Sequence, residues 1–174
     1  LTYTLPELLG SEEEAERFRG GSFFTIYLSP RDYHRVHAPC EGALVGLRHL
    51  PGALYPVNER AVRNVPRLFS RNERLVLSLD TKGGPLALVM VAATCVSTIT
   101  ASLDPQGGRF VRGEREERRP NPPVAVEAAA ELGVFHMGST VVGLLPKDAV
   151  AYTPRREGTP IQLGERFATW LLGD

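Results

Sequence analysis

Runs of strand-forming residues, separated by turn residues, constrain the fold of this chain more than any other feature of its sequence. The runs cover residues 22–28, 43–50, 74–81 and 85–100. They are rich in Val, Leu, Ile and Thr, which favour extended backbone. Pro51-Gly52 and Gly83-Gly84 separate them, as expected of turns. The 174 residues suffice for one domain with a hydrophobic core, so the sequence predicts a single mostly-β domain, a sandwich or flattened barrel with short peripheral helices.

Helix is expected near the N-terminus, in residues 6–21. Ser11 and Glu14 have the spacing of a capping box, and glutamates suit the first turn of a helix because of its dipole. Gly20-Gly21 predicts where the helix ends. We therefore interpret the acidic run as a solvated helix start rather than a metal site.

Two polar segments are predicted to be connections. Residues 57–73 are rich in Arg and have room for a short turn of helix, whereas residues 104–124, charged and proline-rich, predict an exposed, mobile hairpin or loop. Residues 31–74 hold eight Arg against four acidic residues. A local excess of guanidinium groups suits phosphate binding, and scattered solvated arginines are the alternative.

Composition excludes several classes of function. Lys plus Arg and Asp plus Glu both number 20, so net charge indicates no nucleic-acid partner. Cys40 and Cys95 have neither metal-ligand spacing nor a disulfide framework; a reducing compartment and burial as small side chains are expected. No apolar run is long enough for a membrane span, and no signal peptide is recognisable. The chain begins without Met at "LTYTLPELLG", and we expect upstream residues to be missing from it.

The densest polar cluster is "YLSPRDYHRVHAPCEG", residues 27–42, which contains His34 and His37. This spacing is not the i, i+4 pairing of a helical zinc site, and no metal is expected. Histidine titrates near neutral pH, so two histidines in one polar loop favour general acid–base chemistry. A hydrogen-bonded structural histidine is the alternative for either one.

The second unusual stretch is "VFHMGSTVVGL", residues 134–144, where Gly138-Ser139-Thr140 interrupts an apolar run. The Gly-x-Ser-x-Gly elbow of hydrolases is missing. A Gly before Ser leaves the Gly carbonyl open to close approach, as a hydroxyl attacking its own preceding peptide bond requires. A β-bulge is the alternative explanation.

Together these two motifs closely resemble the phosphatidylserine decarboxylases, with supporting matches in "YPVNERAVRNVPRLFSRNERLVLSLDTKGGPLALVMVAATCVSTI". The resemblance covers roughly residues 15 to 150 and implies a duplicated-hybrid-motif, lipoyl-like β fold. It implies that Ser139 is the self-processing serine. Cleavage after Gly138 would give chains 1–138 and 139–174, which stay associated, and Ser139 would become a pyruvoyl group that serves as the cofactor without any metal.

The resemblance also implies roles for other residues. His37 matches the base for self-cleavage, and His34 matches the residue that donates a proton during decarboxylation. Thr140, Met137 and Tyr33 are expected to contact substrate. The implied partner is phosphatidylserine in membranes, and a homodimer, bound peripherally to the cytoplasmic face of the cell membrane, is expected.

One departure is clear: the family completes a Ser-His-Asp triad from a Pro-x-Asp-Gly motif that this chain does not contain. Asp32 does not match that position, and we favour a fragment that lacks it. Two alternatives stay open. The chain could be a non-processing β-fold module that binds lipid or protein, or a pyruvoyl decarboxylase of another serine phospholipid.

Three further residues have less specific expectations. His49 is expected to be structural, and His136 either occupies an ordinary strand position or lines the site. Trp170 is either a packing anchor or an interfacial side chain.

Overall fold

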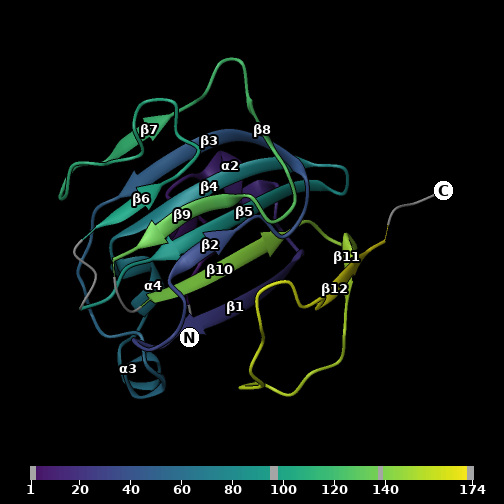
Figure 1. The fold of residues 1–174 in the computed structure, drawn as a ribbon. Helices are drawn as coiled ribbons and strands as arrows, with labels where there is room; N and C mark the ends of the chain where they lie inside the picture. Colours follow the sequence, from purple (N-terminus) through teal and green to yellow (C-terminus); the bar gives the residue numbers. More distant parts are fainter. Residues whose placement is uncertain (1–2, 95–97, 137–138, 172–174) are drawn as a thin grey trace.

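A computed structural model describes residues 3–94, 98–136 and 139–171. Its largest element is an antiparallel sheet of seven strands in the order β1-β10-β5-β4-β3-β7, with β8 also paired to β3 (Figure 1). In that order the strands are β1 (Ser22–Leu28), β10 (Ser139–Leu145), β5 (Gly84–Val91), β4 (Arg74–Thr81), β3 (Gly42–Leu50) and β7 (Glu116–Arg118), and β8 is Val124–Val126.

A smaller sheet packs on one face of the large sheet. It has the order β2-β9-β6, formed by β2 (Arg35–His37), β9 (Glu131–Phe135) and β6 (Ile99–Ala101). Gly133 of β9 lies so close to Met90 of β5 that an added Cβ would be 2.8 Å from the Met90 sulfur. A third, two-stranded sheet pairs β11 (Val150–Tyr152) with β12 (Ala168–Trp170).

The short helices α1 (Leu5–Leu9) and α2 (Glu12–Glu16) pack on the opposite face of the large sheet. Arg48 of β3 pairs with Val76 of β4, and Val76 pairs with Val89 of β5, so the three side chains lie on the same face of the sheet. Side chains alternate along a strand, so Met90, next to Val89, lies on the other face. The Arg48 side chain reaches the backbone of α1. Two more helices, α3 (Glu59–Asn64) and α4 (Leu68–Arg71), lie in the predicted connection 57–73.

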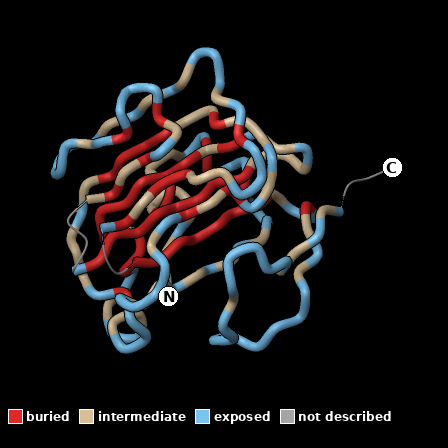
Figure 2. Tube along the Cα trace, in the orientation of Figure 1, coloured by how far each residue is buried: buried red, intermediate tan, exposed pale blue. Residues whose placement is uncertain are grey.

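The core lies between these layers, along the central strands (Figure 2). Every residue of β10 is buried, and β4 and β5 are buried over most of their length. Strands covered on both faces need apolar residues at successive positions rather than alternating ones, which explains the continuous apolar runs. The prediction of a mostly-β sandwich with short peripheral helices is confirmed.

The predicted helix over 6–21 is wrong in detail. Gly10, at φ 68, ends α1, and Ser11 caps α2 by accepting a hydrogen bond from the Glu14 N–H. The Glu14 carboxylate is not solvated at the cap: it accepts hydrogen bonds from Arg48 and Ser78, and Glu14 is only 7% exposed. Helix α2 ends at Glu16, before Gly20.

Two other expectations are revised. The run 85–100 is not one strand, because β5 ends at Val91 and β6 begins at Ile99. The segment 104–124 is not simply a mobile loop: it contains β7, and the buried carboxylate of Asp104 is paired with Arg118. The expectation for Cys95 lies outside the described residues.

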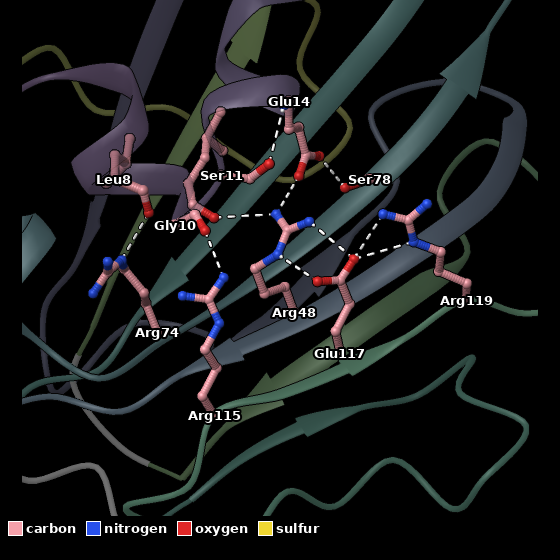
Figure 3. A network of polar contacts seen from close by, with 11 residues as sticks. Leu8, Gly10, Ser11, Glu14, Arg48, Arg74, Ser78, Arg115, Glu117 and Arg119 are labelled. Carbon is pink, nitrogen blue, oxygen red and sulfur yellow. Dashed lines mark hydrogen bonds and ion pairs between the residues drawn. The ribbon is translucent and has the colours of Figure 1, made fainter.

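Three arginines attach α1 to the sheet (Figure 3). The last four carbonyls at a helix C-terminus have no partner within the helix. Arg74, Arg48 and Arg115 together donate to all four, the carbonyls of Glu7, Leu8, Leu9 and Gly10. Burial lowers the pKa of Arg74 to about 10, and the charge of nearby Arg115 adds to this effect.

Candidate active site

The fold brings the two polar motifs together at one end of the large sheet. Strand β1 ends at Leu28, which pairs with Ser139, the first residue of β10. After Leu28 the chain turns, and the Ser29 N–H donates to the Asp32 carboxylate at 2.7 Å. It then enters β2, whose neighbour β9 leads back toward β10. Segments 28–37 and 131–136 are therefore neighbours, and the start of β10 lies beside them.

Ser139 faces the small sheet. Its side chain is on the same face of β10 as that of Val141, which pairs with Met90, and Met90 lies against β9 of the small sheet. Ser139 has no exposed surface, and its hydroxyl has no hydrogen-bond partner among the described residues. A buried polar group without a partner costs about 1–3 kcal/mol. An unsatisfied hydroxyl at this position suits a group that reacts.

Thr140 faces the opposite way. It pairs with Val91, which pairs with Arg74, so its side chain lies on the helix-covered face. The Thr140 hydroxyl is also buried without a partner in the described part of the chain. Because neighbouring residues of a strand point to opposite faces, Ser139 and Thr140 do not face one common ligand in this arrangement. A substrate contact by Thr140 stays a prediction that would require this strand end to rearrange.

The alternative explanation of the tripeptide, a β-bulge, does not hold for the described part of it. The register between β1 and β10 is continuous from Ser22–Leu145 to Leu28–Ser139. Met137 and Gly138 lie outside the described residues, so the substrate contact expected for Met137 and the cleavage position at Gly138 stay predictions.

His37 is half-buried on β2, and both of its ring nitrogens have partners. Nδ1 lies 2.7 Å from the carbonyl oxygen of Ala129, and Nε2 lies 2.8 Å from the hydroxyl of Tyr33. The Tyr33 and His37 rings are stacked, with centroids 5.7 Å apart and planes 20° from parallel. Tyr33, predicted to contact substrate, is thus also a direct partner of the predicted base. Sequence reasoning missed Ala129, because nothing in "EAAAE" distinguishes one alanine from the next.

His34 occupies the turn just before β2. Its Nδ1 contacts the backbone carbonyl of Asp32, and its own carbonyl accepts from the Phe135 N–H at 2.9 Å. The Asp32 carboxylate caps the turn at Ser29.

His136 is exposed, and its Nε2 lies 3.3 Å from the Thr100 hydroxyl of β6. It therefore lies at the rim of the small sheet, three residues before Ser139.

The remaining singled-out residues have structural surroundings. His49 is buried between the Glu114 carbonyl and the Glu73 carboxylate, as a structural histidine would be. Trp170 packs on Gly83, where an added Cβ would be 2.1 Å from the indole ring, which favours the packing anchor. Cys40 is half-buried, and burial raises the pKa of its thiol. Among residues 3–94, 98–136 and 139–171, no three His, Cys, Asp or Glu side chains gather as a metal site requires.

Only part of the arginine-rich stretch can serve as a basic surface. Arg48 and Arg74 are buried, at 7% and 5% exposure. Others have partners of their own: Arg35 with Glu131, Arg63 with Glu59, Arg67 with Glu7 and Arg71 with Tyr55. Much of the excess charge is therefore used inside the domain.

Comparison with known proteins decides the family. The family model described as phosphatidylserine decarboxylase matches residues 1–169. The chain belongs to the phosphatidylserine decarboxylase family. A protein of Acidovorax ebreus named phosphatidylserine decarboxylase proenzyme is 46% identical over 95% of this chain and 60% of its own length. Proteins of the same name from Vibrio cholerae and Xylella fastidiosa are each 43% identical over 96% of this chain, and 61% and 58% of their own lengths.

Both polar motifs lie within the matched region of the phosphatidylserine decarboxylase family. The chain spans about 60% of the length of these curated relatives. In the described part of the chain, no helix is both long and apolar enough to cross a membrane.

Proposed function

We propose that this chain carries the catalytic machinery of a phosphatidylserine decarboxylase that activates itself at Ser139. The single observation that supports it best is the buried hydroxyl of Ser139, which has no partner among the described residues and lies next to a histidine-bearing segment. The name proenzyme, given to the relatives, is consistent with self-activation.

Self-cleavage follows from general chemistry. His37 removes the Ser139 proton, because a serine hydroxyl is a weak nucleophile without a base. The oxygen attacks the Gly138 carbonyl, and the peptide bond is exchanged for an ester. Loss of the Ser139 α-proton then expels residues 1–138 as a carboxylate, and hydrolysis of the resulting dehydroalanine releases ammonia and leaves a pyruvoyl group at residue 139.

The two products are expected to stay associated because of how β10 is placed. After cleavage β10 would belong to the chain 139–174, yet it pairs with β1 on one side and β5 on the other, both in the chain 1–138. Its residues are buried throughout, so separation would expose a core strand.

The residues present suit a pyruvoyl group at position 139. The Ser139 hydroxyl lies on a buried face, and no hydrogen bond among the described residues ties it to another role. The group supplies an electron sink for loss of carbon dioxide, the role otherwise filled by pyridoxal phosphate. His34 delivers the proton that replaces the carboxylate, as a general acid at neutral pH.

The proposed substrate is phosphatidylserine held in a membrane, and the product is phosphatidylethanolamine. We also propose a homodimer bound peripherally to the cytoplasmic face of the cell membrane. The test of function combines the intact mass of the protein with conversion of phosphatidylserine in vesicles. Cleaved protein that releases carbon dioxide supports the proposal, and decarboxylation by protein that remains uncut would refute the mechanism.

A further inference from the structure

Glu131 lies opposite His37 because strand β9 contains a bulge. Val36 of β2 pairs with Gly133 of β9. In an unbroken antiparallel register the next pair would be His37 with Leu132, which is buried. The register shifts at this point, and His37 pairs with Glu131 instead. β-Bulges occur next to active sites, where they re-aim a side chain. This bulge places a carboxylate, in place of a leucine, opposite the histidine.

The Glu131 carboxylate is held by two further side chains. Its Oε2 accepts from the Arg35 guanidinium of β2 at 2.5 Å, and its Oε1 accepts from the hydroxyl of Ser102, just after β6, at 2.5 Å. The hydrogen bonds from Ser102 and then Arg35 lower the pKa of Glu131, and the charge of His37 adds to this effect. Glu131 therefore keeps its negative charge over the pH range in which a histidine titrates.

The ionisable side chains around His37 have opposite effects on its charge. Tyr33, in the turn before β2, stacks on the ring and contacts Nε2, while the turn between β8 and β9 contributes the Ala129 carbonyl at Nδ1. Arg35 lies two residues before His37, on the same face of β2. Residues directly opposite on antiparallel strands have Cβ atoms about 4.5–5.5 Å apart. At such separations the Glu131 carboxylate favours the protonated imidazole and the Arg35 guanidinium disfavours it.

We propose that Glu131 is a positioning residue for self-cleavage: it holds β2 in register with β9 and stabilises the imidazolium that forms when His37 accepts the Ser139 proton. This role adds to that of the residue that orients the ring in a catalytic triad and does not replace it. The inference rests on the proposed function, in which His37 is the base.

The first experiment follows the titration of His37 by NMR in the Ser139→Ala protein, which does not depend on cleavage. Glu131→Gln should lower the midpoint of this titration by about half a pH unit or more, because a neighbouring negative charge is lost. Arg35→Gln should raise it, because a positive charge is lost, whereas a purely structural ion pair predicts the same effect from either change. Glu13→Gln, at an exposed position of α2, is the control for net charge and should leave the midpoint unchanged.

The second experiment restores Ser139 and measures the rate of self-cleavage against pH. The base must be unprotonated, so Glu131→Gln should move the rise of the rate to lower pH. It should also reduce the plateau at higher pH about two- to tenfold, because a weaker base removes the serine proton more slowly. Glu131→Asp keeps the charge and should recover most of both effects. The NMR signals of buried His49 report an intact fold in each variant.

An unchanged His37 midpoint in Glu131→Gln, with the His49 signals intact, would overturn the inference. A shift in the same direction in Glu131→Gln and Arg35→Gln would overturn it as well. Failure of the proposed function looks different. In that case the protein with Ser139 would stay uncut at every pH, while the titration of His37 still followed the charges at positions 131 and 35.

Discussion

The carboxylate of Glu14 and the guanidinium of Arg48 form an ion pair whose side chains are only 9% and 8% exposed. The pair joins α2 to β3, and Arg48 also donates to Glu117 and to the Leu9 carbonyl (Figure 3). A sheet strand and the N-terminal helices are thus held together by an ion pair that is largely shielded from water.

Removing one partner of this pair should be costly. We expect Glu14→Ala to lower the free energy of unfolding by about 3 kcal/mol, because it leaves a buried guanidinium short of one counter-charge. Glu13→Ala, at an exposed position of the same helix, should change it by less than about 0.5 kcal/mol. Urea unfolding measures both, and equal effects would mean that the buried pair contributes no more than a surface charge.

The same network should make stability depend on pH. Hydrogen bonding from Arg48 lowers the pKa of Glu117, with help from Arg119. A lowered pKa in the folded state stabilises the protein above the unfolded value of about 4.3, and the contribution is lost as pH falls below that value. In Glu117→Gln the urea midpoint should therefore fall less between about pH 5 and pH 2 than it does in the wild type. Parallel profiles would show that Glu117 is not coupled to folding.

The unsatisfied hydroxyls at the start of β10 should reduce stability. Ser139→Ala should remain uncut. Introduced into His37→Ala, so that the two proteins compared are both uncut and differ only in the hydroxyl, it should raise the urea midpoint. The gain should be about 1 kcal/mol, since a buried hydroxyl without a partner is removed. Thr140→Val should add a similar amount. Destabilisation by both changes would indicate that the hydroxyls have hydrogen-bond partners after all.

Alanine substitutions of the two histidines of the motif should have different effects on self-cleavage and turnover. His37→Ala should block self-cleavage, because an unassisted serine is a weak nucleophile. His34→Ala should be cut at least partly yet lose about 10²–10⁴-fold in turnover, the usual contribution of a general acid. Gel analysis and carbon dioxide release measure the two effects. The opposite result would exchange the roles of the two histidines and would leave the family assignment unchanged.

Membrane attraction should depend on the exposed arginines of residues 57–73. We expect stronger binding to vesicles that contain phosphatidylserine than to neutral ones, and ~0.5 M salt should remove most of that difference. Reversal of Arg63, Arg67 or Arg71 should weaken it by less than about 1 kcal/mol each, since partners already engage all three. Arg19→Glu, which reverses an exposed and paired arginine outside residues 57–73, is the matched control for the effect of charge reversal itself. Equal binding to both vesicle types would assign these arginines to internal contacts alone.

The sequence predicted the β architecture because strands covered on both faces need continuous apolar runs, as β4 and β10 have. It also singled out the two polar segments that the fold brings together. It failed where a partner distant in the chain decides the outcome. Glu14 has a capping-box position, yet Arg48 and Ser78 take its carboxylate. The contact of the Ala129 carbonyl with His37, 92 positions away, depends on the positive φ of Ala129, and no local pattern encodes either.

The position of β10 between β1 and β5 has a consequence for the order of folding and cleavage. If the chain is cut at Ser139, the break comes at the end of a strand inserted between two strands of the other piece. Insertion is an intramolecular event only while the chain is whole, so folding has to come first and cutting second. The uncut precursor would then recover from denaturant, whereas the activated enzyme, once unfolded, would have to reassemble from separate pieces. After activation, refolding would thus no longer be an intramolecular reaction, so each molecule would have to complete folding before it becomes active.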